Sequence, residues 1–137
     1  MKTIWLNLPV QDVQKSRAFF KAIGFRENPM HADAGHLASF FIGQHDFVLM
    51  LFPQQAFERF AGNSTADTGK GTEMLINIDA QSREEVDAMA ELVKRAGGTI
   101  YAKPGEAEGW MYAFGFADPD GHRWSMLYMD TSTMPRP

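Results

Sequence analysis

Residues 74–101 read MLINIDAQSREEVDAMAELVKRAGGTIY, and this stretch decides the fold. Its β-prone start predicts a strand at 74–79. Ser82 is a good helix N-cap, and Glu85 three residues later completes a capping box. Apolar residues then recur at helical spacing until the pair Gly97-Gly98, which is typical of a helix end. The stretch therefore predicts a strand, a helix and the start of a second strand.

The residues after 101 predict two more strands, at 110–116 and 122–129. The segment KPGEAEG, at 103–109, is rich in glycine and charge and predicts a loop before them. The turn ADPDG, at 117–121, joins the two strands, because proline followed by Asp-Gly is a sequence typical of tight turns.

The first half of the chain repeats this order of elements. A strand is predicted at 4–9 and a capped helix at 12–24. Strands are also predicted at 25–28, 37–42 and 47–52. Two such units, spaced by roughly 70 residues, indicate a tandem βαβββ repeat.

The repeat predicts one α+β domain in which each module covers one sheet with its helix. Module one is 1–52 and module two is 72–130, followed by a tail at 131–137. The segment 53–71 joins the modules, and its first part predicts a short helix.

Composition and charge restrict the classes of function. The 137 residues carry a net charge of −4 with scattered Lys and Arg, which argues against a nucleic-acid partner and favours a cationic or neutral small ligand. Cysteine is absent, which excludes disulfides and thiolate metal ligands. FVLMLF, at 47–52, is too short to span a membrane, and the start lacks a signal-peptide pattern, so we expect a cytoplasmic protein with no membrane partner.

The chain resembles the vicinal oxygen chelate superfamily, which contains glyoxalase I, bleomycin-resistance proteins, fosfomycin-resistance enzymes and extradiol dioxygenases. Two stretches carry the resemblance, LPVQDVQKSRAFFKAIGF at 8–25 and FADPDGHRW at 116–124. The chain most resembles small bacterial proteins labelled as predicted lactoylglutathione lyases. The resemblance implies that the two mixed sheets form a cup, and that the chain forms a homodimer, which would also cover open sheet edges.

The resemblance further implies four positions for the ligands of a divalent metal, in the first and last strands of each half. They fall on Trp5, Met50, Glu73 and Ser125. Such a site needs three or four nitrogen or oxygen ligands, and only Glu73 is a good one. We therefore expect a degenerate metal site and no cofactor.

If the register of the family holds, one side of the strands presents apolar groups with a few polar ones, as small-molecule sites do. The expected ligand-binding residues are Trp5, Asn7, Met50, Phe52, Glu73, Leu75, Asn77 and Ser125. One hypothesis is a bleomycin-resistance-like protein that binds a small aromatic or amphiphilic ligand. The alternative is a metal-dependent lyase, isomerase or dioxygenase, which would contain a divalent metal and use Glu73 as its catalytic proton carrier.

The four histidines are expected to lie outside the site. His31, His36 and His45 fall in or beside turns, where histidines are usually solvated, although a metal cluster in HADAGH is the alternative. His122 follows the ADPDG turn and is expected to complete it or to make a hydrogen bond at the sheet edge.

Other notable residues of the last turn and strand are expected to be structural. Asp118 and Asp120 are expected to form the turn. Trp124 and Met126 have the opposite strand parity to Ser125, which predicts that they fill the core.

Overall fold

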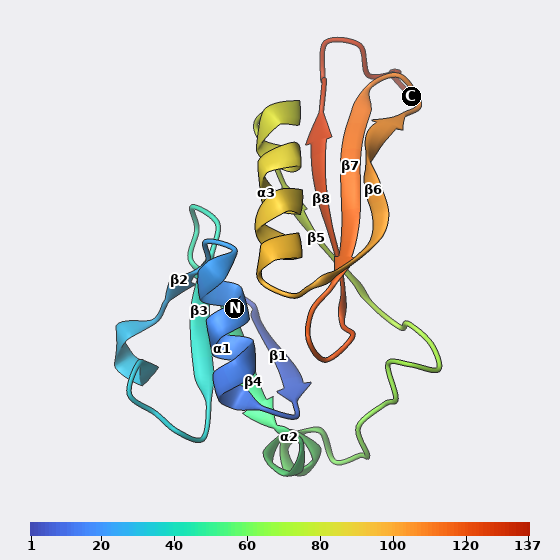
Figure 1. Ribbon diagram of the computed structural model, residues 1–137. Coiled ribbons are helices and arrows are strands. Elements are labelled where there is room, and N and C mark those ends of the chain that lie inside the picture. Colours follow the sequence, from blue (N-terminus) through green and yellow to red (C-terminus); the bar gives the residue numbers. More distant parts are fainter. The chain divides into compact units, whose positions relative to one another are not determined.

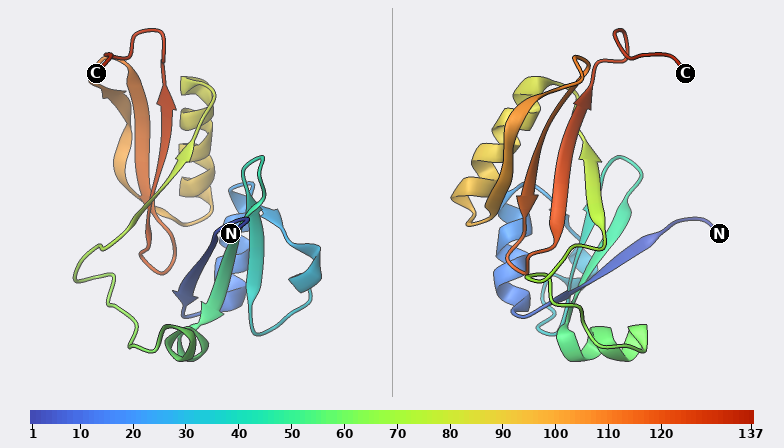
Figure 2. Two further views of the ribbon diagram at one scale, coloured as in Figure 1. Left: turned by 180° about the vertical axis from the view of Figure 1, so that it is seen from behind. Right: turned by 90° about the vertical axis from the view of Figure 1, so that its right-hand side faces the viewer.

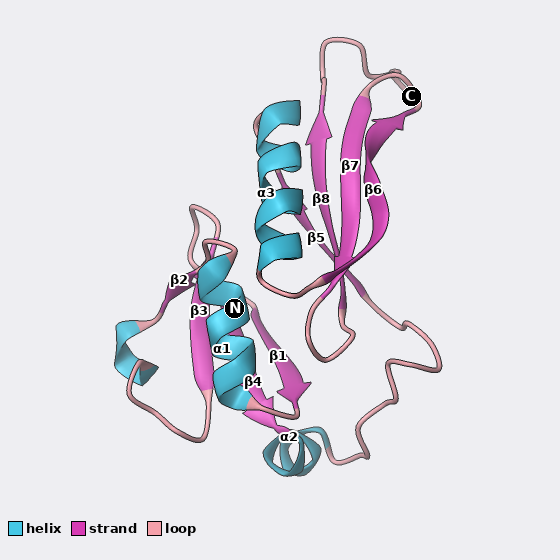
Figure 3. Cartoon of the chain, in the orientation of Figure 1, coloured by secondary structure: helices cyan, strands magenta, loops and turns pink.

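The computed structural model describes residues 1–137 (Figures 1 and 3). The chain divides into two compact units, Met1–Asp67 and Thr68–Pro137. The boundary between them falls inside the segment 53–71, which was expected to join the modules. No helix has the length and apolar character needed to cross a lipid bilayer.

The first unit contains one four-stranded sheet with the strand order β1-β4-β3-β2. Strand β1 is parallel to β4, and the other neighbouring strands are antiparallel. The elements in chain order are β1 (Trp5–Val10), α1 (Val13–Ala22), β2 (Arg26–Glu27), the 3-10 helix η1 (Pro29–His31), β3 (Ala38–Ile42), β4 (Phe47–Pro53) and α2 (Gln54–Ala61). The predicted βαβββ module and the short helix after it are confirmed.

The second unit repeats this architecture. Its sheet has the order β5-β8-β7-β6, with β5 parallel to β8 and the other pairs antiparallel. The elements in chain order are β5 (Leu75–Asp79), α3 (Arg83–Arg95), β6 (Thr99–Ala107), β7 (Met111–Ala117) and β8 (Arg123–Met129). The α+β class and the tandem repeat are therefore confirmed.

The helix boundaries follow from the capping residues predicted in the sequence. The Asp12 side chain accepts a hydrogen bond from Lys15 N at 3.0 Å, and Ser82 Oγ accepts one from Glu85 N at 3.1 Å. Gly97 follows α3 with a positive φ of 88°, a conformation that costs glycine little.

One helix covers one face of each sheet, and the core of each module lies between them. Contacts join α1 to β3 and β4, and α3 to β6, β7 and β8. The layer of α3 against its sheet is visible edge-on in Figure 2. The largest fully buried apolar side chains are Phe20, Ile23, Phe40, Leu49 and Leu51 in the first unit and Val86, Val93, Phe114, Phe116 and Trp124 in the second.

The turn before β8 is built around a buried carboxylate. Asp118 is only 5% exposed, and its side chain accepts hydrogen bonds from Asp120 N, His122 N and Trp124 Nε1 at 3.0, 3.0 and 3.1 Å. The predicted structural roles of Asp118 and of the His122 backbone are confirmed, and so are the core positions of Trp124 and Met126. Burial raises the pKa of Asp118, while the charge of His122 and these hydrogen bonds act in the opposite direction.

The prediction of a loop at 103–109 is wrong, because β6 includes most of this segment and ends at Ala107. Two register shifts, between Ile100 and Ala102 and between Ala102 and Gly105, interrupt the pairing of β6 with β7. Strand β6 lies at the edge of the sheet, where a proline such as Pro104 is tolerated because one side of the strand is unpaired. The homodimer, which would cover such edges, stays a prediction, and so does the cup.

Candidate functional site

Each sheet has a second face, turned away from its helix, which we call the helix-free face. In the first unit the ring of Phe40 lies 5.9 Å from that of Phe20 in α1, so Phe40 points toward the helix. Its neighbour Ser39 must then point to the other face. Ser39 is directly opposite Met50, and Met50 is opposite Asn7, so these three residues form one row across the helix-free face.

The second unit has an equivalent face. Tyr112 Oη donates a hydrogen bond to Asp87 of α3 at 2.7 Å, so Tyr112 points toward the helix. Every second residue of β7 from Tyr112 therefore points the same way. Gly115, three residues along β7, has the opposite parity. It pairs with Ser125, and Ser125 pairs with Asn77, which gives a matching row on the helix-free face.

The sequence-predicted residues fall into two sets, one on each of these faces. Trp5 and Phe52 have the parity of Asn7 and Met50, and Leu75 has the parity of Asn77. Trp5 is 64% exposed and Leu75 is 55% exposed. The first set is therefore Trp5, Asn7, Met50 and Phe52, and the second is Leu75, Asn77 and Ser125.

Glu73 lies outside both sets. It was expected to begin a strand, but β5 begins at Leu75, and Glu73 is exposed in a bend two residues earlier. Because Asn7 pairs with Met50 as Asn77 pairs with Ser125, the residue equivalent to Trp5 in the second module is Leu75.

The side chains at the four expected metal positions do not fit a divalent metal. An indole, a thioether and a hydroxyl occupy three of them, and these are poor ligands for such an ion. No group of three or more His, Cys, Asp or Glu residues is placed to hold a metal ion. The two faces instead present apolar surface beside the neutral amides of Asn7 and Asn77.

The apolar part of the first helix-free face extends toward α2. The ring of Phe52 lies 5.0 Å from that of Phe60 in an edge-to-face arrangement. Such aromatic pairs favour this geometry and hold each other in place. The pair therefore forms a fixed apolar border at the end of β4.

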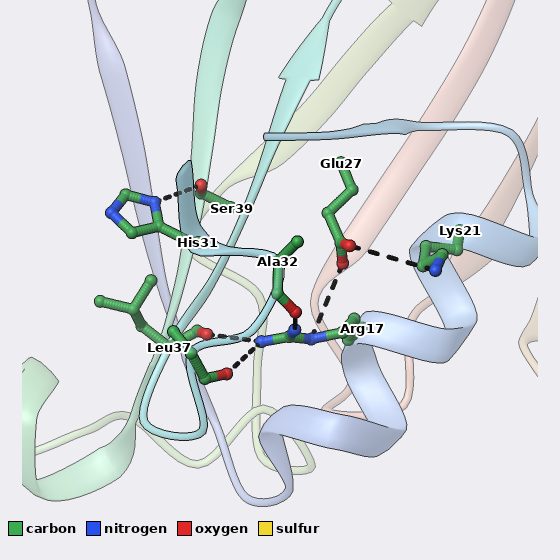
Figure 4. A network of polar contacts seen from close by, with 8 residues as sticks. Arg17, Lys21, Glu27, His31, Ala32, Leu37 and Ser39 are labelled. Carbon is green, nitrogen blue, oxygen red and sulfur yellow. Dashed lines mark hydrogen bonds and ion pairs between the residues drawn. The ribbon is translucent and has the colours of Figure 1, made fainter. Parts of the chain in front are cut away.

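His31 was expected to be solvated, but it is half-buried and has a partner within the chain. Its Nδ1 lies 2.8 Å from Ser39 Oγ, and Ser39 is fully buried in the row that also contains Met50. Figure 4 shows the imidazole beside this serine. His36 and His45 are exposed, as expected.

Arg17 in α1 holds the loop that follows His31. Its guanidinium donates hydrogen bonds to the carbonyl oxygens of Ala32, Ala34 and Leu37 at 2.5, 2.6 and 2.7 Å (Figure 4). Its Nε lies 3.7 Å from Glu27 Oε2. The side chain is thus the main polar link between α1 and the loop.

Charged and phenolic groups also gather on the helix side of the second sheet. A hydrogen bond from Arg83 to Glu106 raises the pKa of Arg83, and the hydrogen bond to Asp87 raises the pKa of Tyr112. The Arg83 guanidinium lies 5.2 Å from the centre of the Tyr128 ring. This cluster fastens α3 to the sheet.

Sequence reasoning missed a second group of residues, on the helix-free face of the second sheet. Tyr101 lies over Gly115, and Arg123 lies over the ring of Tyr101. The one available signal was the glycine in the middle of a predicted strand, because such a glycine often marks a close approach of another group.

Comparisons with known proteins agree with this architecture. The family model described as the Glyoxalase/Bleomycin resistance protein/Dioxygenase superfamily matches residues 3–126. A hypothetical protein from S. aureus is 31% identical with a TM-score of 0.81, and the match covers 93% of this chain and 94% of that one. No curated protein matches the chain.

Two more distant structures share the fold. A glyoxalase/bleomycin resistance protein/dioxygenase family enzyme from Burkholderia phytofirmans is 19% identical with a TM-score of 0.75, over 91% of this chain and 96% of that one. A lactoylglutathione lyase from Agrobacterium tumefaciens is 19% identical with a TM-score of 0.67, over 91% of both chains. At this identity the likeness concerns the fold alone.

Proposed function

Because the chain belongs to the glyoxalase/bleomycin resistance protein/dioxygenase superfamily, we propose that it binds a small aromatic or amphiphilic ligand without a metal ion. Membership alone leaves the activity open, because one fold supports many functions. The helix-free faces supply the binding surface, with Trp5 as the main apolar contact.

The observation that carries this proposal is the exposure of Trp5. Trp5 is the first residue of β1 and is paired with Val48, and its indole is 64% exposed, so it gives up the burial that usually stabilises a tryptophan. It presents a flat apolar surface beside the amide of Asn7, and this combination suits stacking with an aromatic ring. Leu75, the equivalent residue of the second module, is also exposed.

The choice of side chains also supports binding without a metal. Asn7 and Asn77 are neutral amides that can donate and accept hydrogen bonds, and Ser125 adds a hydroxyl. These groups orient a ligand, whereas metal-dependent chemistry needs His or carboxylate ligands around one ion.

The protein is expected to contain no stoichiometric metal. The measurement is the metal content of untagged protein purified without chelator, repeated after incubation with Zn(II), Ni(II), Mn(II) and Fe(II) and removal of the excess. One tightly held ion per chain would contradict the proposal and favour a metal-dependent lyase, isomerase or dioxygenase that uses Glu73.

Replacing Trp5 with alanine is expected to weaken the binding of a neutral aromatic probe by about tenfold, because the stacking surface is lost. The dissociation constant of 2-naphthol, measured by NMR titration of the full chain, checks this. Glu73→Gln is the matched control and should leave this constant unchanged, because Glu73 lies outside β5. If Glu73→Gln raised this dissociation constant and Trp5→Ala left it unchanged, the binding role of Trp5 would be refuted.

A further inference from the structure

Tyr101 lies on the helix-free face of the second sheet because of a local irregularity in β6. Ile100 pairs with Phe116 and Ala102 pairs with Gly115, so Tyr101 is an extra residue between two pairs that are adjacent in β7. Such a bulge redirects a side chain. Tyr101 Oη donates a hydrogen bond to the carbonyl oxygen of Trp124 at 3.1 Å, which fixes the ring across the neighbouring strands.

Gly115 provides the space for this ring. A Cβ atom added to Gly115 would lie 2.6 Å from both Cε1 and Oη of Tyr101, which is far closer than such atoms approach. Any larger residue would therefore push the ring off the sheet. The absence of a side chain at Gly115 is a condition for the observed position of Tyr101.

The fixed ring in turn supports Arg123. The guanidinium carbon of Arg123 lies 4.5 Å from the ring centre of Tyr101, in cation–π geometry. Arg123 is half-buried on the helix-free face, where its position in β8 is opposite Leu75. Unlike Arg17, Arg26 and Arg83, it forms no ion pair with a carboxylate of the chain.

Two neutral hydrogen-bonding groups lie in the next row of the same face. Ser125 follows Arg123 by two residues in β8, so both side chains point the same way, and Asn77 is opposite Ser125. A guanidinium is a planar fork that matches a carboxylate in bidentate fashion, and an amide and a hydroxyl are suitable additional donors. The exposed side chain of Leu75 supplies apolar surface beside them.

We propose that Arg123, held by Tyr101 over Gly115, forms a carboxylate-binding site together with Asn77 and Ser125. The ligand is then an aromatic or amphiphilic carboxylate, which replaces the cationic or neutral ligand expected from the net charge. This inference rests on the proposed function and assigns its ligand class. A local unpaired guanidinium outweighs a net charge of −4 spread over the surface, because exposed charges beyond about 10 Å are screened.

The test compares benzoate with its neutral isostere benzamide by NMR titration of the ¹⁵N-labelled full chain. We expect benzoate to bind about tenfold more tightly than benzamide, with the largest shifts at residues 77, 115, 123 and 125. Arg123→Gln should reduce the affinity for benzoate to that for benzamide and leave benzamide unchanged. Retained benzamide binding also shows that the variant is folded.

Two glycine variants test the positioning role of the ring. Gly115→Ala should displace Tyr101 and weaken benzoate binding about fivefold, with benzamide affected less, because the guanidinium loses its support. Gly105→Ala is the matched control in the neighbouring strand, where the nearest atom to the new Cβ is a carbonyl oxygen at 3.8 Å, and should have no effect.

The outcomes separate this inference from the proposed function. Equal affinity for benzoate and benzamide, or unchanged benzoate affinity in Arg123→Gln, would overturn the carboxylate site and leave a neutral aromatic ligand in place. Failure of the wild-type protein to bind either probe at millimolar concentration would overturn both.

Discussion

Replacing Asp118 with alanine is expected to lower the free energy of unfolding by about 3 kcal/mol. The substitution removes the acceptor of three hydrogen bonds, and one of the donors is the indole Nε1 of Trp124, which is fully buried. Water can replace the carboxylate at the turn, but it has little access to the indole. The buried donor left without a partner accounts for much of the loss.

The measurement is urea unfolding of Asp118→Ala, Trp124→Phe and the double variant. Trp124→Phe removes the indole N–H, so alanine at 118 no longer leaves it unpaired, and the two losses should fall short of additivity by about 1 kcal/mol. Strict additivity would contradict the assignment of the loss to this hydrogen bond. Asp118→Asn keeps one acceptor oxygen and should fall between the wild type and the alanine variant.

The same turn connects stability to the proposed site. Asp118 fixes the start of β8, and Trp124, which it anchors, lies between Arg123 and Ser125 in that strand. The carbonyl oxygen of Trp124 also accepts the hydrogen bond from Tyr101. The side chain of Trp124 therefore packs in the core, while its backbone carbonyl group holds Tyr101 on the opposite face of the sheet.

Local signals in the sequence were sufficient to predict the modules. The caps at Asp12 and Ser82 and the glycines after each helix act within a few residues of the chain, and the structure confirms them. The prediction that Trp124 fills the core while Ser125 points the other way was also correct, because the alternation of side chains along a strand is a local property. The shared strand order of the two sheets then follows from the repeat.

The errors arose where partners distant in sequence decide the structure. Pro104 and Gly105 usually mark loops, yet an edge strand with bulges accommodates both. His31 lies in a turn-rich segment, and only the fold brings it next to Ser39. The position of Tyr101 over Gly115 likewise depends on the pairing of β6 with β7, which contains a register shift beside Tyr101. The alternation of residue types along the strand does not indicate this shift.

The second large effect is expected at Arg17. Replacing it with methionine, which keeps much of the apolar stem, should lower the free energy of unfolding by about 3 kcal/mol. The change removes three hydrogen bonds to carbonyl oxygens and leaves the carboxylate of Glu27, whose side chain is 16% exposed, without its nearest cation. Lys21 is 4.0 Å from Glu27 and is mostly exposed, so it compensates little.

Thermal and urea unfolding of three variants separates these two causes. Arg17→Met with Glu27→Gln should recover about 1 kcal/mol relative to Arg17→Met alone, because the mostly buried carboxylate of Glu27 is then no longer left without Arg17. Lys21→Ala is the matched control on the same helix and should change stability by less than about 0.5 kcal/mol, as exposed pairs do. Equal losses in the Lys21 and Arg17 variants would contradict a special role for Arg17.

Hydrogen exchange distinguishes a local role of Arg17 from a general loss of stability. The guanidinium binds the carbonyl groups of Ala32, Ala34 and Leu37, so Arg17→Met should speed amide hydrogen exchange in this loop. The amides in the core of the second unit should stay protected from exchange. The contact between His31 and Ser39 should loosen with the loop, and the imidazole signals in NMR spectra report this directly. If exchange at 32–37 stayed at the wild-type rate, the loop would be held by its packing, and the three hydrogen bonds would contribute only to the stability of α1.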